Sequence, residues 1–209
     1  MNTKLFLVRP GVTEWHRERK IVGHRDVGLS ADGITEVTSA AAALAHLPLS
    51  DIVTSPLVRA VQTAEVIARK RGSAVNRDPR LADLKVGKWE GQTYDDVARL
   101  PDYQKFLSDP LGQKLPGGED LRQVRDRAAG AVAQALRDAP AGECVAVVAH
   151  GAICRILICH YLGIDLTGFH RVRVPHGSIS VFSFRDDREP PLVHTIGWRP
   201  TIQEVVSHG

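Results

Sequence analysis

ECVAVVAHG, residues 143–151, contains the strongest signal for a buried strand in this chain. A continuous apolar run of this length is typical of a strand in a parallel sheet, where both faces of the strand are covered. His150 and Gly151 end the run, and the residues that follow favour a helix to about Leu162. We therefore expect a central strand that delivers His150 to the start of a helix.

Other short strands and helices alternate around this stretch. Residues 4–9 and 51–54 are apolar runs that end just before Pro10 and the pair Ser55-Pro56. Residues 178–184 and 192–197 favour late strands, antiparallel and near an edge of the sheet. We expect helices at residues 31–47 after an N-cap at Ser30, at 56–71 with Pro56 in the first turn, at 119–137 and at 151–162.

This alternation of strands and helices indicates an α/β fold. We expect one domain over residues 1–209, built as a three-layer α/β/α sandwich with a mainly parallel central sheet. Residues 78–116 are irregular, with several Gly and Pro residues between short helical pieces. We interpret this segment as a small inserted cap.

The composition fits a folded domain and excludes several classes of protein. The chain has 209 residues, 43% of them hydrophobic, which is enough for a sizeable core. No apolar run is long enough to span a membrane, so we expect a cytoplasmic protein. The net charge of +3 is spread along the chain and does not favour nucleic acid as a partner. Cys144, Cys154 and Cys159 lie in apolar stretches without metal-binding spacing, and we interpret them as reduced core residues.

Basic residues follow three of the expected strands. Arg9 follows the first strand, Arg59 lies shortly after the second, and His150 follows the strand at residues 143–149. Ligands of open α/β sheets bind beyond the carboxyl ends of the strands. Guanidinium groups bind phosphate oxygens in pairs, and the helix after Gly151 adds backbone N–H groups. The three strand ends together predict a pocket for a phosphate or another oxyanion.

Six motifs along the chain also carry a family resemblance. In order, they are LVRPGVTEW, GHRDVGLSADG, SPLVRAVQTA, LADLKVGKWEG, LPGGED and VVAHGAICRIL. Together they resemble the histidine phosphatase superfamily, also called the phosphoglycerate mutase-like family, from about residue 5 to residue 162. The short chain is more similar to the small phosphatase branch than to the longer mutases. This resemblance implies a small phosphorylated or otherwise anionic ligand and no metal or other cofactor.

At three positions the pocket departs from the pattern of that family. The first motif of the family reads Arg-His-Gly, and its histidine attacks phosphorus. Here that position is Pro10, whose nitrogen lies in an amide and cannot be phosphorylated. A phosphate-contacting Asn of the family is His16 in this chain, and the Glu that acts as general acid aligns with the shorter carboxylate of Asp83.

Other positions match the family. The resemblance assigns Arg9 and Arg59 to a phosphate clamp and His150 to the second histidine, which donates to the transferring phosphoryl group. His176 could reach the rim of the pocket, where the family often has an Asn. The residues expected to hold the phosphate are Arg9, Gly11, Thr13, Arg59 and Ala152.

Two main functions stay open on these residues. The loss of the nucleophile favours a protein that binds a phosphate ester and has little or no ordinary phosphohistidine-type activity. The alternative is an active phosphomonoesterase with rearranged chemistry, in which His16, Asp83 and His150 act through a histidine acceptor or through direct attack by water. Non-phosphoryl chemistry on a carboxylate or sulfate is a third possibility. Residues 178–184 are a candidate edge strand for a homodimer.

Overall fold

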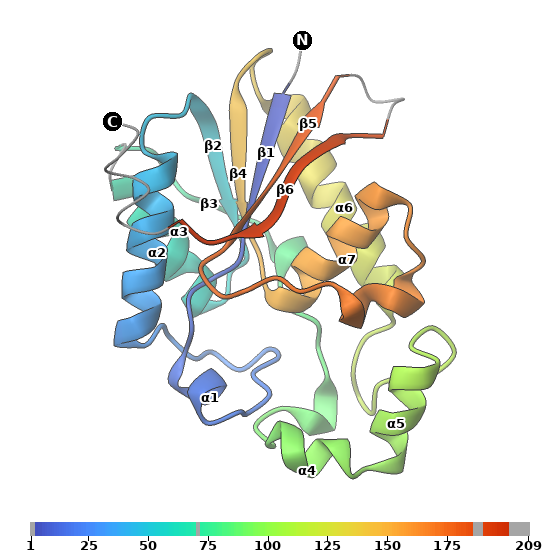
Figure 1. Cartoon of the computed structure of the whole chain (residues 1–209). Helices are drawn as coiled ribbons and strands as arrows, with labels where there is room; N and C mark the ends of the chain where they lie inside the picture. Colours follow the sequence, from blue (N-terminus) through green and yellow to red (C-terminus); the bar gives the residue numbers. More distant parts are fainter. Residues whose placement is uncertain (1–2, 70–71, 186–189, 201–209) are drawn as a thin grey trace.

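The structure is a computed structural model that describes residues 3–69, 72–185 and 190–200. Its strands form one sheet in the order β3-β2-β4-β1-β5-β6 (Figure 1). Neighbours from β3 to β1 are parallel, whereas β5 and β6 are antiparallel additions at one side. The strands are β1 (Thr3–Val8), β2 (Leu49–Thr54), β3 (Asn76–Arg77), β4 (Cys144–Val148), β5 (Ile179–Phe184) and β6 (Leu192–Trp198). The mainly parallel sheet predicted from the sequence is confirmed.

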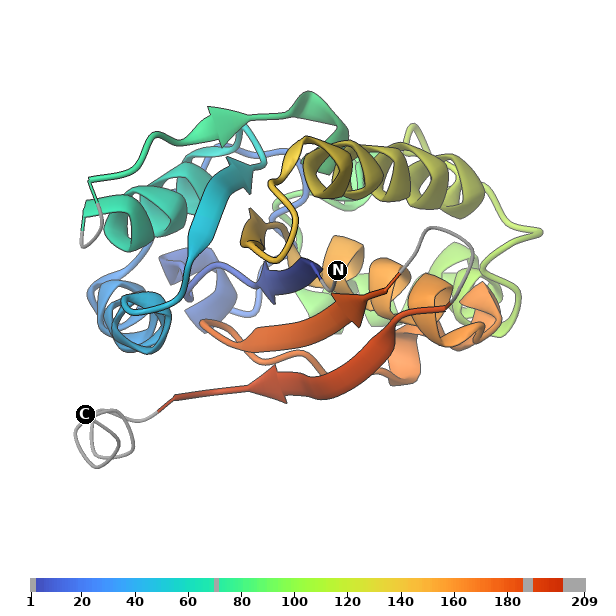
Figure 2. The same cartoon turned by 90° about the horizontal axis from the view of Figure 1, so that it is seen from above.

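Helices cover both faces of this sheet, as Figure 2 shows from above. On one side lie α2 (Ala31–Leu44) and α3 (Val58–Arg69), and on the other lie α6 (Leu121–Asp138) and α7 (Gly151–Leu162). Successive residues of a strand point to opposite faces. Leu5 and Leu7 of β1 therefore join the core beneath α6 and α7, whereas Phe6 and Val8 join the core beneath α2 and α3.

The remaining elements lie beyond the carboxyl ends of the parallel strands, at the bottom of Figure 1. They are α1 (Glu14–Arg17), η1 (Pro79–Leu81), η2 (Gly87–Trp89), α4 (Tyr94–Ala98) and α5 (Pro101–Ser108), and η3 (Leu166–Arg171) follows α7. The segment between β3 and α6 has its own apolar contacts, because Trp89 lies edge-on to Phe106 at 5.9 Å and Leu115 is buried with them. This segment covers one end of the sheet.

The structure corrects two expectations about element boundaries and edges. Pro56 precedes α3 rather than forming its first turn, since Leu57 N–H donates to Ser55 Oγ and the helix begins at Val58. Residues 178–184 are not an edge strand, because β5 lies between β1 and β6 and both of its sides are paired. That segment is therefore unable to pair with a second copy of the chain.

Other expectations from the sequence agree with the structure. Ser30 is the N-cap of α2, and its side chain accepts from Gly33 N–H. Cys144, Cys154 and Cys159 are buried in the core. Within the described ranges, no helix is both long and apolar enough to cross a membrane.

Two glycines allow the loop after β1 to lie directly on the start of α2. A Cβ atom at Gly33 would lie 2.1 Å from the Val12 carbonyl oxygen, and one at Gly11 would lie 2.3 Å from the Gly33 carbonyl oxygen. Both neighbours are backbone atoms, which cannot move aside as a flexible side chain can. This contact sets the position of the loop that carries Arg9 and Pro10 into the site.

We expect Gly33→Ala to destabilise the protein by about 1–3 kcal/mol, because the added methyl group forces these backbone segments apart. Urea unfolding of the purified chain measures the change. Gly130→Ala is the matched control, since Gly130 lies in α6 with nothing within 4 Å of its added Cβ. That control should be stabilised by about 0.5–1 kcal/mol. Equal stability of Gly33→Ala and the wild type would contradict the close contact.

Candidate active site

Side chains from the carboxyl ends of the parallel strands meet in one small cavity. Arg9 follows β1, Arg59 lies in the first turn of α3 after β2, and His150 lies between β4 and α7. The cavity has a volume of about 20 Å³, close to the space that about one water molecule needs. It is lined by Arg9, Pro10, Gly11, His16, Arg59, Asp83, His150, Gly151 and His176. The convergence predicted for Arg9, Arg59 and His150 is present in the geometry.

Arg59 connects two loops to this cavity. Its side chain is 2% exposed, and its guanidinium donates to the carbonyl oxygens of Gly23 (2.7 Å) and Arg25 (3.0 Å). It also donates to Asp83 Oδ2 at 2.9 Å. A buried guanidinium needs such partners, because an unpaired buried charge is strongly unfavourable. Arg59 therefore fixes both the loop at residues 23–25 and the carboxylate of Asp83.

The backbone of Asp83 is held as firmly as its side chain. Its carbonyl oxygen accepts from His24 Nε2 (2.6 Å) and from Arg127 Nη2 (3.0 Å), and Arg127 forms an ion pair with Glu119 at 2.9 Å. Its Oδ1 accepts from Leu84 N–H at 2.9 Å. Both carboxylate oxygens of Asp83 are thus engaged as acceptors.

His16 lies in α1 and turns one ring nitrogen away from the cavity. Thr13 is the N-cap of α1, and Thr13 N–H donates to His16 Nδ1 at 3.2 Å. Because a backbone N–H can only donate, Nδ1 must be the acceptor, so the proton of a neutral His16 is on Nε2. His16 therefore presents an N–H donor and not a lone pair.

His150 is buried between a hydroxyl and a carboxylate. Its Nε2 lies 2.7 Å from Ser55 Oγ, and its Nδ1 lies 3.7 Å from Asp83 Oδ2. A carboxylate only accepts, so this surrounding favours the proton on Nδ1 and a hydrogen bond from the Ser55 hydroxyl to Nε2. Ser55, His150 and Asp83 resemble a hydrolase triad in their order, but Ser55 is fully buried and does not line the cavity. Ser55 therefore positions His150 and is not placed to reach a ligand.

His176 and Arg9 form the wall opposite. Arg9 donates to the Val174 carbonyl oxygen and, at 2.8 Å, to His176 Nε2. Since a guanidinium has no acceptor, His176 Nε2 is the acceptor of this bond. The His176 ring also lies edge-on to His16, with 4.3 Å between the ring centres. Arg9 lies against Gly151, where a Cβ atom would come within 2.9 Å of the guanidinium carbon.

All three imidazoles of the cavity are held in their neutral form. Burial first, and then the charges of Arg9 and Arg59, lowers the pKa of His16 from 6.5 to about 4. Burial first, and then Arg9, lowers the pKa of His176 to about 2. Burial first, and then Arg59, lowers the pKa of His150 well below its ordinary value. The cavity contains two positive charges, on Arg9 and Arg59, and one negative charge, on Asp83. Its net charge is therefore positive even though the histidines are neutral, which favours an anionic ligand.

The structure separates the predicted site residues into two groups. Thr13 and Ala152 are not among the residues that line the cavity, because the polar groups of Thr13 are used to cap α1 and to hold His16. Sequence reasoning missed Ser55 and Arg127, whose roles are to position His150 and Asp83. Ser55 stands at a strand end inside the motif SPLVRAVQTA, which was a usable signal. Across the described parts of the chain, no group of His, Cys, Asp or Glu residues is arranged to hold a metal ion.

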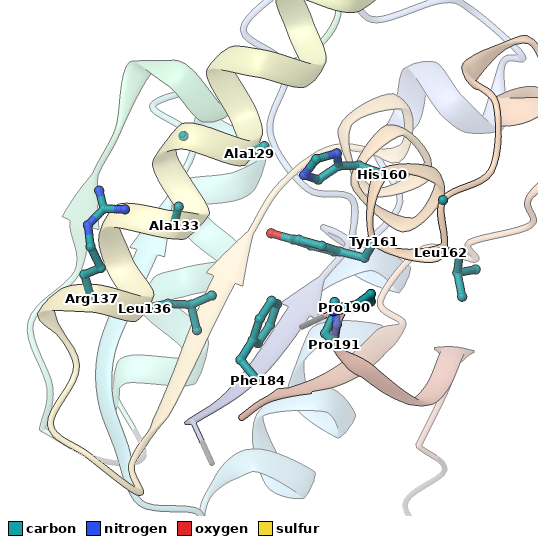
Figure 3. Close-up of a pocket in the computed structure, with 12 residues that line it drawn as sticks. Ala129, Ala133, Leu136, Arg137, His160, Tyr161, Leu162, Phe184, Pro190 and Pro191 are labelled. Carbon is teal, nitrogen blue, oxygen red and sulfur yellow. The ribbon is translucent and has the colours of Figure 1, made fainter. Parts of the chain in front are cut away.

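A larger hollow lies elsewhere, between α6, α7 and the end of β5 (Figure 3). It has a volume of about 690 Å³ and includes Leu136, Tyr161, Phe184 and Pro191 in its lining. His160 lies in this lining with its ring next to Tyr161, as Figure 3 shows, and far along α7 from His150. The hollow lacks converging charged groups, so size alone does not identify the candidate site.

The arginines and histidines of this α/β/α sandwich gather at the carboxyl ends of its parallel strands, which is where open α/β sheets bind their ligands. The chain belongs to the histidine phosphatase superfamily (branch 1), whose family model matches residues 5–196. This result confirms the resemblance seen in the sequence motifs.

Individual relatives are similar over nearly their whole length. The chain is 30% identical over 207 residues to "Probable phosphoglycerate mutase GpmB" of Escherichia coli O1:K1 / APEC, covering 98% of this chain and 94% of that protein. A histidine-to-alanine mutant of Entamoeba histolytica phosphoserine phosphatase, solved with phosphoserine, matches with a TM-score of 0.83, 28% identity and coverage of 93% and 96%. A mycobacterial glucosyl-3-phosphoglycerate phosphatase in complex with VO3 matches with a TM-score of 0.84, 26% identity and coverage of 95% and 99%. The relatives are thus phosphatases and mutases.

We expect the folded protein to lose stability as the pH falls below about 6.5, because the unfolded chain then protonates histidines that the folded chain keeps neutral. The lowered pKa values of His16 (about 4) and His176 (about 2) set this direction. Each such proton contributes a slope of about 1.4 kcal/mol per pH unit. Urea unfolding between pH 8 and pH 5 measures it. His176→Gln should have a shallower slope than the wild type by about one proton. Identical slopes in His176→Gln and the wild type would be inconsistent with a buried neutral His176.

Proposed function

We propose that this chain binds a small phosphate ester in the cavity between Arg9, Arg59 and His150 and has little or no phosphohistidine-type phosphatase activity. The phosphate of the ligand accepts hydrogen bonds from the guanidinium N–H groups of Arg9 and Arg59 and from the imidazole N–H of His16. Such a protein would act as a sensor of the ester or as a module that binds a partner when the ester is present.

One observation carries this proposal: each imidazole of the cavity has its acceptor nitrogen occupied by an internal donor. Thr13 N–H donates to His16, the Arg9 guanidinium donates to His176, and the Ser55 hydroxyl lies 2.7 Å from His150 Nε2. Attack on phosphorus needs a free lone pair that points along the line of the bond being broken. Of the three histidines, His16 presents its Nε2–H to the cavity, which suits binding of an anion, whereas Nδ1 of His150 faces Asp83 and His176 is hydrogen-bonded to the backbone of Pro10.

The identity of residue 10 supports the same proposal. By the family resemblance, Pro10 occupies the position of the nucleophilic histidine, and Pro10 lines the cavity. Its nitrogen has no basic lone pair and no proton to exchange. The carbonyl oxygen of Pro10 accepts from Gly177 N–H at 3.2 Å, so the loop is tied to the strand that follows His176. This contact holds the loop in place, so the ring of His16 or His176 does not readily move to the site of residue 10.

Relatives support the class of ligand. One relative is a phosphoserine phosphatase mutant in which a histidine is replaced by alanine, and it was solved in complex with phosphoserine. Another was solved with VO3, a small oxyanion. By analogy, an oxyanion pocket of this fold can hold a phosphate ester when one histidine is missing.

Direct hydrolysis is the second candidate function. His16 has a pKa of about 4 and is the unprotonated base near neutral pH, and its ring lies in the cavity that Asp83 also lines. If a flip of the ring released Nδ1 from Thr13, His16 could take a proton from a water molecule that attacks phosphorus. As the bond from the water oxygen to phosphorus forms, the bond from phosphorus to the ester oxygen breaks. The departing alkoxide would take a proton from solvent, His16 would return its proton to solvent, and orthophosphate would be released.

Paired binding and turnover measurements decide between the two candidates. We expect vanadate and orthophosphate to raise the Tm of the wild type, and we expect Arg59→Ala and His16→Ala to reduce this shift. We also expect no release of phosphate from a panel of small phosphomonoesters above the background of the buffer. Release that disappears in His150→Ala would overturn the proposal in favour of hydrolysis. The absence of any Tm shift in a folded wild type would overturn the anion pocket itself.

We expect Pro10→His to gain phosphatase activity on an aryl phosphate, because the variant supplies an imidazole at the end of β1 beside both arginines. Release of the aryl alcohol measures the gain, and Pro10→Ala is the control for a simple change in loop freedom. Equal activity in the two variants would indicate that His16 and Asp83 also hold the site away from the chemistry of the family.

A further inference from the structure

The hollow between α6, α7 and the end of β5 has the size and composition of a ligand site (Figure 3). Its volume of about 690 Å³ lies within the range of about 300–1,000 Å³ that is typical of sites for small molecules. Aromatic and aliphatic side chains form most of its inner wall, among them Leu136, Tyr161 and Phe184. We call this space the α6–α7 hollow. It is separate from the cavity at the strand ends, because no residue in the described ranges lines both.

Small residues of α6 leave this space open. Ala129 and Ala133 lie about one turn apart on the face of α6 that is opposite α7. Gly130 lines the same space, and a Cβ atom added to it would have nothing within 4 Å. With side chains this short, α6 does not fill the gap between itself and the last turn of α7.

The Tyr161 hydroxyl is aimed into the α6–α7 hollow without a partner. Figure 3 shows the Tyr161 side chain pointing from α7 towards α6 with its oxygen at the tip. The ring is held by Phe182 and Phe184, each with 5.3 Å between the ring centres. In the parts of the chain that the structure describes, the hydroxyl forms no hydrogen bond. Burial raises the pKa of Tyr161, so the hydroxyl keeps its proton and is available as a donor. A buried phenol usually has a hydrogen-bond partner, and here that partner has to come from outside the chain.

The charges around the α6–α7 hollow favour a neutral ligand. Among the described residues that line it, Arg137 alone carries a charge, and Figure 3 shows its guanidinium turned away from Tyr161. That guanidinium donates to the Gln134 side chain at 2.9 Å. The ring of His160 lies 5.2 Å from that of Tyr161, and burial first, and then the charge of Arg125, lowers the pKa of His160 and keeps it neutral near pH 7. A charged ligand would lose its hydration in this space without gaining an opposite charge.

Water is a poor occupant of the same space. A water molecule in a cavity needs about two to four polar partners. The inner wall of the α6–α7 hollow offers mainly the Tyr161 hydroxyl and the His160 ring for this purpose. Replacement of such water by an apolar ring is favourable, because it removes apolar surface from water on both sides of the contact.

We propose that the α6–α7 hollow binds a neutral, planar aromatic molecule that carries a hydrogen-bond acceptor, such as a carbonyl oxygen or an unprotonated ring nitrogen. The Tyr161 hydroxyl donates to this acceptor, and Leu136 and Phe184 pack against the apolar part of the molecule. This ligand is distinct from the phosphate ester, because His150 precedes α7 whereas Tyr161 lies in the last turn of that helix. At a rise of about 1.5 Å per residue, these two positions are about 16 Å apart along the helix. The inference does not depend on the proposed function.

A fluorescent probe tests this site on the full chain. The dye prodan is a neutral, flat naphthalene with a propionyl and a dimethylamino group, and its emission shifts to the blue in an apolar site. We expect it to bind the wild type in a saturable manner with blue-shifted emission. Ala133→Phe places a ring in the hollow and should abolish this binding. Tyr103→Phe removes the hydroxyl of a tyrosine in α5 and should retain it. Thermal unfolding establishes that each variant is folded.

A second comparison tests the hydrogen bond itself. Acetylnaphthalene carries a carbonyl oxygen that ethylnaphthalene lacks, and each is titrated as a competitor of prodan. Tyr161→Phe keeps the ring and removes only the hydroxyl. We expect this variant to bind acetylnaphthalene about five- to tenfold more weakly than the wild type, which is the usual scale for one hydrogen bond. Its affinity for ethylnaphthalene should stay within about twofold of the wild-type value, since that molecule has no acceptor to lose.

Several results would overturn this inference. Failure of prodan to bind the folded wild type, or unchanged binding in Ala133→Phe, would remove the site. An equal effect of Tyr161→Phe on the two naphthalenes would remove the hydrogen bond and with it the acceptor of the ligand. Displacement of prodan by saturating orthophosphate would place the probe in the strand-end cavity instead. Self-association of the wild type that Ala133→Phe abolishes would make the hollow an interface between copies of the chain. Phosphate binding is measured separately, so the proposed function and this inference can fail independently.

Discussion

The ion pair between Arg59 and Asp83 holds the candidate site together. Arg59 is 2% exposed, and its guanidinium also donates to the carbonyl oxygens of Gly23 and Arg25. Removing one partner from a buried pair leaves an uncompensated charge, which typically costs about 3–5 kcal/mol. The pair therefore ties the start of α3, the loop before α2 and the cap to one another. Because Asp83 also faces His150, the position of His150 after β4 depends on the same ion pair between Arg59 and Asp83.

A cavity built from donors has a consequence for how it responds to an anion. The histidines are neutral because burial and the nearby arginines oppose a further positive charge. A phosphate dianion reverses this balance, since its charge favours protonation of the imidazoles around it. If the proposed ligand binds, its binding is therefore coupled to proton uptake, and its affinity rises as the pH falls towards the pKa of the bound state. A site designed to transfer a phosphoryl group would instead need one imidazole with an uncommitted base nitrogen.

The sequence predicted the frame of the molecule better than the details of its site. The apolar runs at residues 4–9, 51–54 and 143–149 identified three parallel strands, because a strand covered on both faces has little choice of composition. The N-cap of α2 was predicted correctly at Ser30. The start of α3 was predicted two residues too early, at Pro56, because a turn through Ser55 precedes the helix. The position of β5 inside the sheet depends on β6, a later strand that no local pattern near residue 180 describes.

The sequence could not predict which ring nitrogen of each histidine in the cavity accepts a hydrogen bond and which one carries the proton. This property bears most directly on function. His16 was a candidate nucleophile by residue type, yet its role follows from Thr13, whose backbone N–H takes the Nδ1 lone pair while its hydroxyl caps the helix. By the family resemblance, Pro10 stands where a nucleophilic histidine would be, and Thr13 N–H occupies Nδ1 of the nearby His16. Both features favour the proposed binding role over phosphoryl transfer. Binding energy that is shared equally by the bound ester and the transition state does not accelerate a reaction. On the proposed function, the positive charge of Arg9 and Arg59 beside this loop therefore contributes to recognition of an anion rather than to acceleration of a reaction.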